Sequence, residues 1–215
     1  ADLADGSHTA DFRYVRHTVT EGKYALGLRL FEYGRQVERK WDISRVARPY
    51  MEHLSQRTGA SVMLSICEGG SVITLDQVEA RDKLRIVSDA GARLPIYCTS
   101  QGKVFLAHMP RAQAETLLRR QSMTQFTPHT ITDVSALLQE VDACRTNGFA
   151  IENGEYKIGL RSISAPVYTV DRTVRYTVGV IGMFRSTHSD EFRSAVEQVC
   201  ATAATISAAL GYREA

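Results

Sequence analysis

The sequence predicts an α+β fold in which a six-stranded antiparallel sheet is flanked by helices. Two strand-like runs, 61–67 and 71–78, are separated by only Glu68-Gly69-Gly70, which is typical of an antiparallel hairpin. Apolar residues repeat with helical spacing before, between and after such runs. No strand-like run is followed by a glycine-rich phosphate loop, so the sheet is predicted to be a meander rather than a Rossmann core.

The N-terminal part of the chain is predicted to hold a hairpin and a connecting helix. Residues 1–11 are small and polar and are expected to form a tail. The runs 12–16 and 23–26 predict a short hairpin, with Gly22 in its turn. Helical spacing then begins, in a stripe that consists of Leu26, Leu30, Tyr33 and Val37.

The remaining elements alternate between helical and strand-like patterns. Asp42 is the expected cap of a helix that Pro49 kinks and Gly59 ends. After the 61–78 hairpin, a third strand is expected at 84–88. The later helices are predicted at 102–108, 111–120 and 133–147, and the later strands at 149–152, 162–168 and 176–184. The last helix carries the stripe Phe192, Val196, Val199, Ala203, Ile206 and Leu210.

Composition limits the possible classes of protein. The 215 residues are enough for one main domain, and 44% of them are hydrophobic and 23% charged, as in globular proteins. We expect a cytoplasmic protein, because no apolar run reaches the length of a membrane span and the chain shows no signal peptide. With a formal net charge of +2, this chain is a poor candidate for tight DNA binding. Four separated cysteines and six dispersed histidines give no metal-site spacing, so neither metal nor cofactor is expected.

The segment 93–107 has the anatomy of a ligand cradle. Pro95 favours an extended chain before a small polar turn, and an apolar helix follows. Thr99 or Ser100 can cap that helix, whose first N–H groups lack internal partners and favour an anion or carbonyl oxygen. The alternative interpretation is an ordinary capped helix.

Several short motifs, taken in order, give the chain a resemblance to a known family. They are Tyr24-Ala25-Leu26-Gly27, Leu94-Pro95, Cys98-Thr99-Ser100-Gln101-Gly102-Lys103, Thr130-Ile131-Thr132-Asp133, Gly148-Phe149-Ala150, Glu155, Gly159-Leu160-Arg161 and Ser164-Ala165-Pro166. Between about residues 12 and 211 the chain resembles the IclR family of bacterial transcriptional regulators. The resemblance implies a GAF-like effector-binding domain at 41–215, a linker helix at 27–40, and at 1–26 a tail with the wing hairpin of a largely missing winged helix-turn-helix.

The resemblance also implies a set of effector-binding residues. The turn before the 102–108 helix supplies Cys98, Thr99, Ser100, Gln101 and Gly102, with the amides of Ser100 and Gln101 facing ligand oxygens. Asn153 and Glu155 fall in a loop that gives an acidic contact in small-acid-binding relatives. Gly179 and Ile181 stand where such relatives carry two serines, which predicts a wider and more apolar pocket that Met183 also lines. We therefore expect a ligand with a polar head and an apolar or aromatic body.

The expected function is that of a ligand-responsive regulator. A small organic acid or aromatic catabolic intermediate would control operator DNA binding, which the N-terminal winged helix-turn-helix would perform in a homodimer or homotetramer. Two other classes stay open from the residues alone. One is a small enzyme that uses Cys98 as nucleophile or Glu152 and Glu155 in acid–base chemistry. The other is a module that only oligomerises.

Overall fold

The computed structural model describes residues 15–17, 24–33, 43–80 and 91–213. The chain divides into two compact units, residues 1–42 and 43–215. In the first unit, β1 (Val15–His17) and β2 (Tyr24–Leu26) form an antiparallel hairpin, and residues 28–33 are helical. The predicted hairpin and connecting helix are thus confirmed at these positions. The rest of both elements, including Val37, lies outside the described residues.

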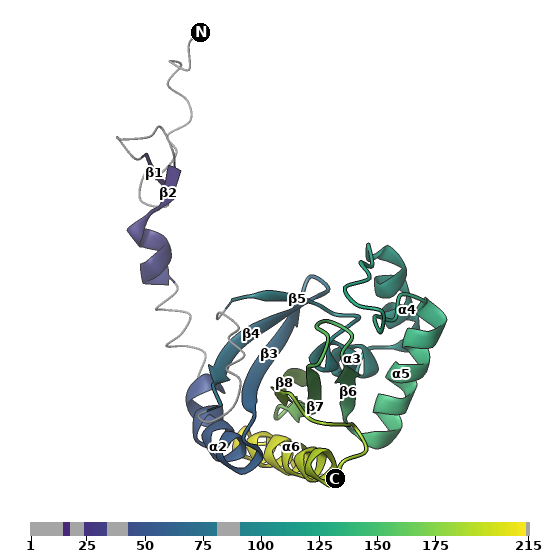
Figure 1. Cartoon of the computed structure of the whole chain (residues 1–215). Coiled ribbons are helices and arrows are strands. Elements are labelled where there is room, and N and C mark those ends of the chain that lie inside the picture. The colour runs from purple at the N-terminus through teal and green to yellow at the C-terminus, as the bar shows by residue number, and fades with distance from the viewer. Residues whose placement is uncertain (1–14, 18–23, 34–42, 81–90, 214–215) are drawn as a thin grey trace. The chain divides into compact units, whose positions relative to one another are not determined.

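The second unit is built on the predicted six-stranded antiparallel sheet (Figure 1). Its strands are β3 (Ser61–Glu68), β4 (Ser71–Val78), β5 (Arg93–Pro95), β6 (Ala150–Asn153), β7 (Arg161–Tyr168) and β8 (Val174–Gly182). Their order across the sheet is β5-β4-β3-β8-β7-β6. Two three-stranded meanders, one from each half of the unit, therefore meet where β3 pairs with β8.

One face of this sheet is covered by α2 (Ile43–Thr58) and α6 (Asp190–Ala209). Val62 and Leu64 of β3 and Val178 and Val180 of β8 point to these helices, as period-2 alternation requires. The core on this side also contains Ala47, Met51, Leu54, Ile163, Ala165, Val167, Phe192, Val199 and Ile206. Of the predicted stripe of the last helix, Phe192, Val199, Ala203 and Ile206 are buried here and Val196 and Leu210 are partly buried. Ser189 caps the first turn of this helix.

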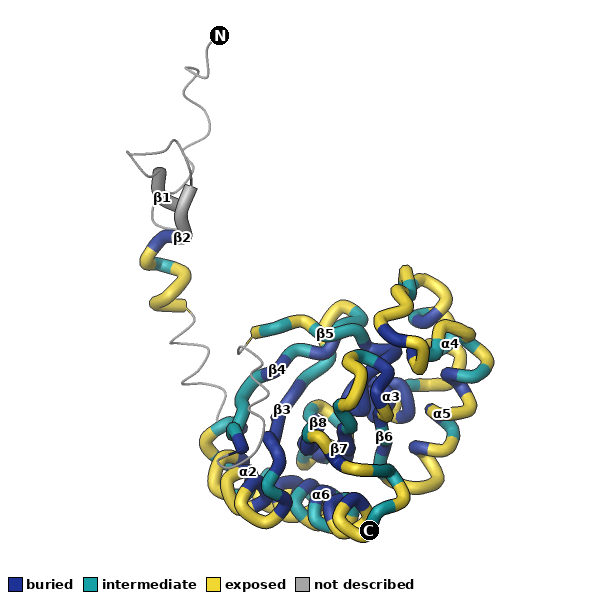
Figure 2. Tube along the Cα trace, in the orientation of Figure 1, coloured by how far each residue is buried: buried dark blue, intermediate teal, exposed yellow. Residues whose placement is uncertain are grey.

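The opposite face is covered by α3 (Ser100–Ala107), with α4 (Arg111–Arg120) and α5 (Val134–Asn147) packed beside it. All eight residues of α3 are buried, and the tube at the α3 label in Figure 2 is dark blue. Asp133 caps α5, and Gly148 ends it in the left-handed conformation that glycine adopts readily. Among the helices that the structure describes, none is long and apolar enough to cross a membrane.

The outer edge of the sheet is formed by β5, which pairs with β4 at 71–73. The third strand expected at 84–88 lies outside the described residues and stays a prediction. A three-residue strand that contains a proline carries no alternation pattern, so it was predicted only as an extended segment.

Candidate functional site

The N-terminus of α3 is fixed by one hydroxyl and one close backbone contact. Thr99 is its N-cap: the Thr99 Oγ1 accepts a hydrogen bond from the Gly102 amide at 3.2 Å and donates one to the Pro95 carbonyl at 2.9 Å. A Cβ at Gly102 would overlap the carbonyl group of Ile96, so only glycine lets α3 pack this closely on the preceding segment. Thr99 and Gly102 therefore position the helix end, while the first-turn amides of Ser100 and Gln101 remain as donors.

Below this helix end, four buried side chains form a chain of hydrogen bonds. Ser100 Oγ donates to Ser162 Oγ at 2.9 Å, and Ser162 Oγ donates to Glu152 Oε2 at 3.1 Å. Ser164 Oγ lies 2.8 Å from Ser100 Oγ. Because the single proton of Ser100 goes to Ser162, Ser164 must donate to Ser100. The chain therefore runs from Ser164 through Ser100 and Ser162 to the carboxylate, across α3, β7 and β6.

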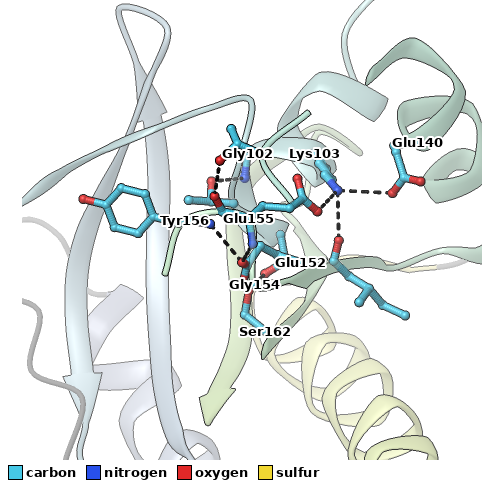
Figure 3. Close-up of polar contacts among 12 residues, drawn as sticks. Gly102, Lys103, Glu140, Glu152, Gly154, Glu155, Tyr156 and Ser162 are labelled. Carbon is cyan, nitrogen blue, oxygen red and sulfur yellow. Dashed lines mark hydrogen bonds and ion pairs between the residues drawn. The ribbon is translucent and has the colours of Figure 1, made fainter. Parts of the chain in front are cut away.

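Glu152 also holds the loop that follows β6. Its Oε1 accepts the amide protons of Glu155 at 2.5 Å and Tyr156 at 3.1 Å (Figure 3). Burial raises the pKa of Glu152 above its ordinary value, although these amides and Ser162 favour the ionised form. One carboxyl group thus joins the loop to the serine chain.

The same loop is tied to α3 by a buried ion pair. The Lys103 ammonium is 1% exposed and lies 2.6 Å from Glu155 Oε1, 3.1 Å from Glu140 Oε2 and 3.2 Å from the Ile151 carbonyl oxygen (Figure 3). Burial raises the pKa of Glu155, and the charge of Lys103 opposes that shift. This ion pair fixes the distance between the helix end and the loop.

Two threonine hydroxyls also hydrogen-bond to backbone carbonyls of this loop. Thr127 Oγ1 donates to the Gly154 carbonyl at 2.6 Å, and Thr130 Oγ1 donates to the Glu155 carbonyl at 2.6 Å. The loop is therefore held by side chains from three separate segments before any ligand binds.

Cys98 lies at the same place but is not an activated nucleophile. Its side chain is fully buried, and burial, reinforced by the nearby carboxylates of Glu155 and Glu152, raises its pKa to about 12. The neutral thiol is a poor nucleophile. His108, the histidine nearest to Cys98 in sequence, instead has its ring nitrogens 2.8 Å from the Val104 carbonyl oxygen and 3.0 Å from the Tyr168 hydroxyl.

The structure brings together some of the predicted site residues and separates others. Ser100, Gln101 and Glu155 lie with the network under α3. Asn153 is exposed, and it is Glu152, one position earlier, that faces the serines. Met183 is 66% exposed and, with Ile181, lines a different cavity of about 260 Å³. Asn153 and Met183 therefore lie outside the network that Ser164, Ser100, Ser162 and Glu152 form under α3.

The expected widening of the pocket at Gly179 is wrong. A Cβ built at this position would overlap the Ser164 Oγ and the Ile163 carbonyl oxygen. The hydroxyl of the neighbouring strand already occupies the space that a side chain at 179 would need. The polar groups at this point of the sheet come from β7 rather than β8.

Ser162 and Ser164 are not among the predicted effector-binding residues, and Glu152 is predicted only as a candidate acid–base residue of an enzyme. Ser162 and Ser164 alternate along β7 with Ile163 and Ala165, which face the opposite core. That alternation is a signal present in the sequence, because small polar residues at every second position of a buried strand predict a polar inner face.

The described residues give no sign of a metal centre: they contain no group of three or more His, Cys, Asp or Glu side chains placed to hold an ion. A second cavity, of about 430 Å³, lies between β7 and α6, away from the serine chain. The groups that the structure places at the α3 N-terminus are thus serine hydroxyls, one carboxyl group and the helix-end amides.

Comparisons with known proteins agree on one kind of protein. A family model described as "Bacterial transcriptional regulator IclR C-terminal" matches residues 35–208. The HTH-type transcriptional regulator XynR of Escherichia coli (strain K12) is 30% identical over 199 residues, which are 93% of this chain and 79% of XynR.

Solved structures share the fold. The Thermotoga maritima IclR matches with a TM-score of 0.79 and 27% identity, over 94% of this chain and 81% of that chain. An IclR homolog from Microbacterium hydrocarbonoxydans, complexed with 4-hydroxybenzoate, matches with a TM-score of 0.78 and 22% identity, over 93% of this chain and 80% of that one.

Proposed function

This chain belongs to the IclR family of bacterial transcriptional regulators, and on that premise we propose that residues 43–215 form an effector-binding domain that senses a small organic metabolite. The family and the relatives reported above are regulators of transcription rather than enzymes. The high pKa of Cys98 is consistent with this, because it keeps the thiol neutral.

The observation that carries the proposal is the buried hydrogen-bond chain at the N-terminus of α3. Ser100 and Ser164 are 0% exposed, Ser162 is 4% exposed, and Glu152 is 3% exposed. Each of these groups has a hydrogen-bond partner in the chain, which offsets the cost of burying it, and the Ser100 and Gln101 amides beside the chain remain as donors for a ligand. The site supports an effector whose acidic oxygens meet the amides of Ser100 and Gln101.

The effector would act by shifting a population of conformers. A ligand that contacts α3, β6 and β7 together favours the arrangement in which these elements are closest, and it can shift the equilibrium only by its difference in affinity for the two states. We further propose that the protein works as a homodimer or homotetramer, in which this shift controls how an N-terminal winged helix-turn-helix binds operator DNA.

A thermal-shift screen tests the proposal. The panel contains short oxoacids and aromatic acids, among them benzoate and 4-hydroxybenzoate. An effector at one hundred times its Kd stabilises the folded state by about 2.7 kcal/mol, which raises the Tm of a domain of this size by roughly 5–10 °C.

Ser162→Ala is the diagnostic variant, because it interrupts the hydrogen-bond chain, and Ser194→Ala on the exposed surface of α6 is its matched control. We expect the shift to shrink in Ser162→Ala and to persist in Ser194→Ala. If no acid stabilises the wild-type protein, or if Ser162→Ala responds as the wild type does, the proposed site is wrong.

A further inference from the structure

We infer that Gln101, Ser65 and Thr177 form a second polar subsite, which binds an uncharged polar group at the end of the effector remote from the α3 N-terminus. This inference rests on the proposed function and deepens it: the effector is an acid that also carries a hydroxyl or carbonyl group at its far end.

Two of these residues have buried hydroxyls without partners. Ser65 on β3 and Thr177 on β8 are register partners, and both are 0% exposed. In the part of the chain that the structure describes, neither Ser65 Oγ nor Thr177 Oγ1 has a hydrogen-bond partner. Because buried hydroxyls are nearly always bonded, two adjacent exceptions call for an explanation, and a ligand group would provide one.

Both hydroxyls lie on the face of the sheet that α3 covers. Leu64 and Val178, the neighbours of Ser65 and Thr177 in sequence, belong to the core on the α2 and α6 side. The alternation of a strand therefore turns Ser65 and Thr177 to the opposite face. The β-bulge beside Ser65 leaves this direction unchanged, because β3 pairs with β8 in unbroken register.

The third member, Gln101, is a buried amide with weak partners. It is 4% exposed, and its Nε2 donates to the sulfur of Met63 at 3.5 Å. A thioether sulfur is a weak acceptor. Its Oε1 lies 3.4 Å from Ser100 Oγ, whose single proton goes to Ser162. The Gln101 Nε2 therefore lacks a strong acceptor and its Oε1 lacks a strong donor, so both atoms are available to a polar group of a ligand.

The position of these groups fits one end of a small effector. Met63, which Gln101 contacts, pairs with Gly179, and Gly179 pairs with Ser164 of the serine chain. Ser65 and Thr177 form the next row on the same face, about 7 Å further along the strands. A benzene ring or a short carbon chain spans such a distance. Serine, threonine and glutamine carry no charge, so they suit a hydroxyl or carbonyl group rather than a second carboxylate.

Isothermal titration of the whole chain with benzoate and 4-hydroxybenzoate tests this subsite, because the two acids differ only in the distal hydroxyl. We expect the wild-type protein to bind 4-hydroxybenzoate about tenfold more tightly, as one good hydrogen bond to buried groups predicts. Thr177→Val keeps the side-chain shape and removes the hydroxyl. In that variant the ratio of the two Kd values should fall to about one, while the affinity for benzoate is retained.

Two further variants complete the test. Ser65→Ala should lower the same ratio, whereas Thr205→Val on the exposed surface of α6 should leave it unchanged. Without ligand, Thr177→Val should melt at or above the wild-type temperature, because it removes an unpartnered buried hydroxyl. A lower melting temperature with an unchanged ratio would show that an internal water bridges the hydroxyls, and would overturn the inference.

The remaining outcomes separate the two proposals. If wild type binds the two acids equally, or if Thr177→Val keeps the preference, the second subsite is wrong and the proposed function stands. The same holds if other acids of the panel bind and neither of this pair does. If no acid of the panel stabilises the protein, the proposed function itself fails.

Discussion

The buried ammonium group of Lys103 joins four segments of the fold. It links α3, which carries it, to Glu140 on α5, to the Ile151 carbonyl on β6 and to Glu155 in the following loop. Fully buried lysines are rare, because an ammonium group loses its hydration on burial and needs compensating partners. Here three oxygens supply that compensation, and the loop whose amides bond to Glu152 is positioned as a result.

Lys103→Met should therefore destabilise the domain strongly. The substitution leaves the Glu155 carboxylate, which is 6% exposed, buried without its cation, and losses of about 3–5 kcal/mol are typical of such a change. Urea denaturation measures the loss. Arg175→Met is the control, because it breaks the exposed ion pair with Asp171 and should cost less than about 1 kcal/mol.

The double variant Lys103→Met with Glu155→Gln should recover part of that loss, since it removes the uncompensated buried charge. A Lys103→Met protein within about 1 kcal/mol of the wild type would contradict the role given to this ion pair.

Asn153 lies one position away from the residue that faces the serine chain. The resemblance predicts that Asn153 contacts the ligand, whereas in the structure it is Glu152 whose side chain meets the serine chain. Side chains of a strand alternate between its faces, so an error of one position exchanges the inner and outer residues. The short β6 strand offers too few alternating positions in the sequence to settle the register.

Among the elements, α3 depends on a close approach at Gly102. A Cβ at Gly102 would overlap the Ile96 carbonyl group, whereas a Cβ at Gly148, at the end of α5, would meet no atom within 4 Å. Gly148 instead has a positive φ of 77°, which favours glycine for conformational reasons. The two glycines are therefore required for different reasons.

Gly102→Ala and Gly148→Ala should separate these two reasons. Gly102→Ala should push α3 off the 96–98 segment, lower the free energy of unfolding by about 1–3 kcal/mol and reduce the effector-induced thermal shift. Gly148→Ala should cost about 1–2 kcal/mol through backbone strain and leave that shift unchanged. Differential scanning fluorimetry with and without the acid reads both effects. Equal retention of the shift by the two variants would contradict the placement of the site at α3.

Elements with strong local signals were predicted closely. The boundaries of α4 and β4 agree with the sequence-based ranges, and the Thr99 cap was one of the two expected. The pairing of β3 with β8 and the meeting of Ser100 with Ser162 could not be predicted, because they join residues that are distant in sequence. Hydroxyl-rich strands reveal which face is polar, but they do not reveal which helix covers it.

Both hydrophobic cores that the structure describes belong to residues 43–215. This matches the α+β class predicted from the hairpin spacing and helical stripes. In the first unit the 28–33 helix leaves large apolar side chains exposed, with Leu28 at 73% and Phe31 at 65%. Each of the two cores therefore packs residues of the second unit against one another.

A chain that begins at residue 43 should fold independently. Because it keeps both cores and all six strands of the large sheet, its Tm should lie within about 2 °C of that of the whole chain. Scanning calorimetry of the two proteins at equal concentration tests this expectation. A decrease of more than about 4 °C, which corresponds to roughly 1–2 kcal/mol, would mean that residues 1–42 contribute to the stability of the second unit.

The pairing of β3 with β8 also determines when the site can form during folding. Each meander is built from neighbouring hairpins and can form early, whereas β3 and β8 meet only after a long loop has closed. Ser65 and Thr177 lie on opposite sides of that junction, and so do Gln101 of the first half and Ser162 of the second. A half-made or half-folded chain therefore has hairpins but neither the complete serine chain nor the junction that carries Ser65 and Thr177, so the proposed effector site forms only after the sheet is complete.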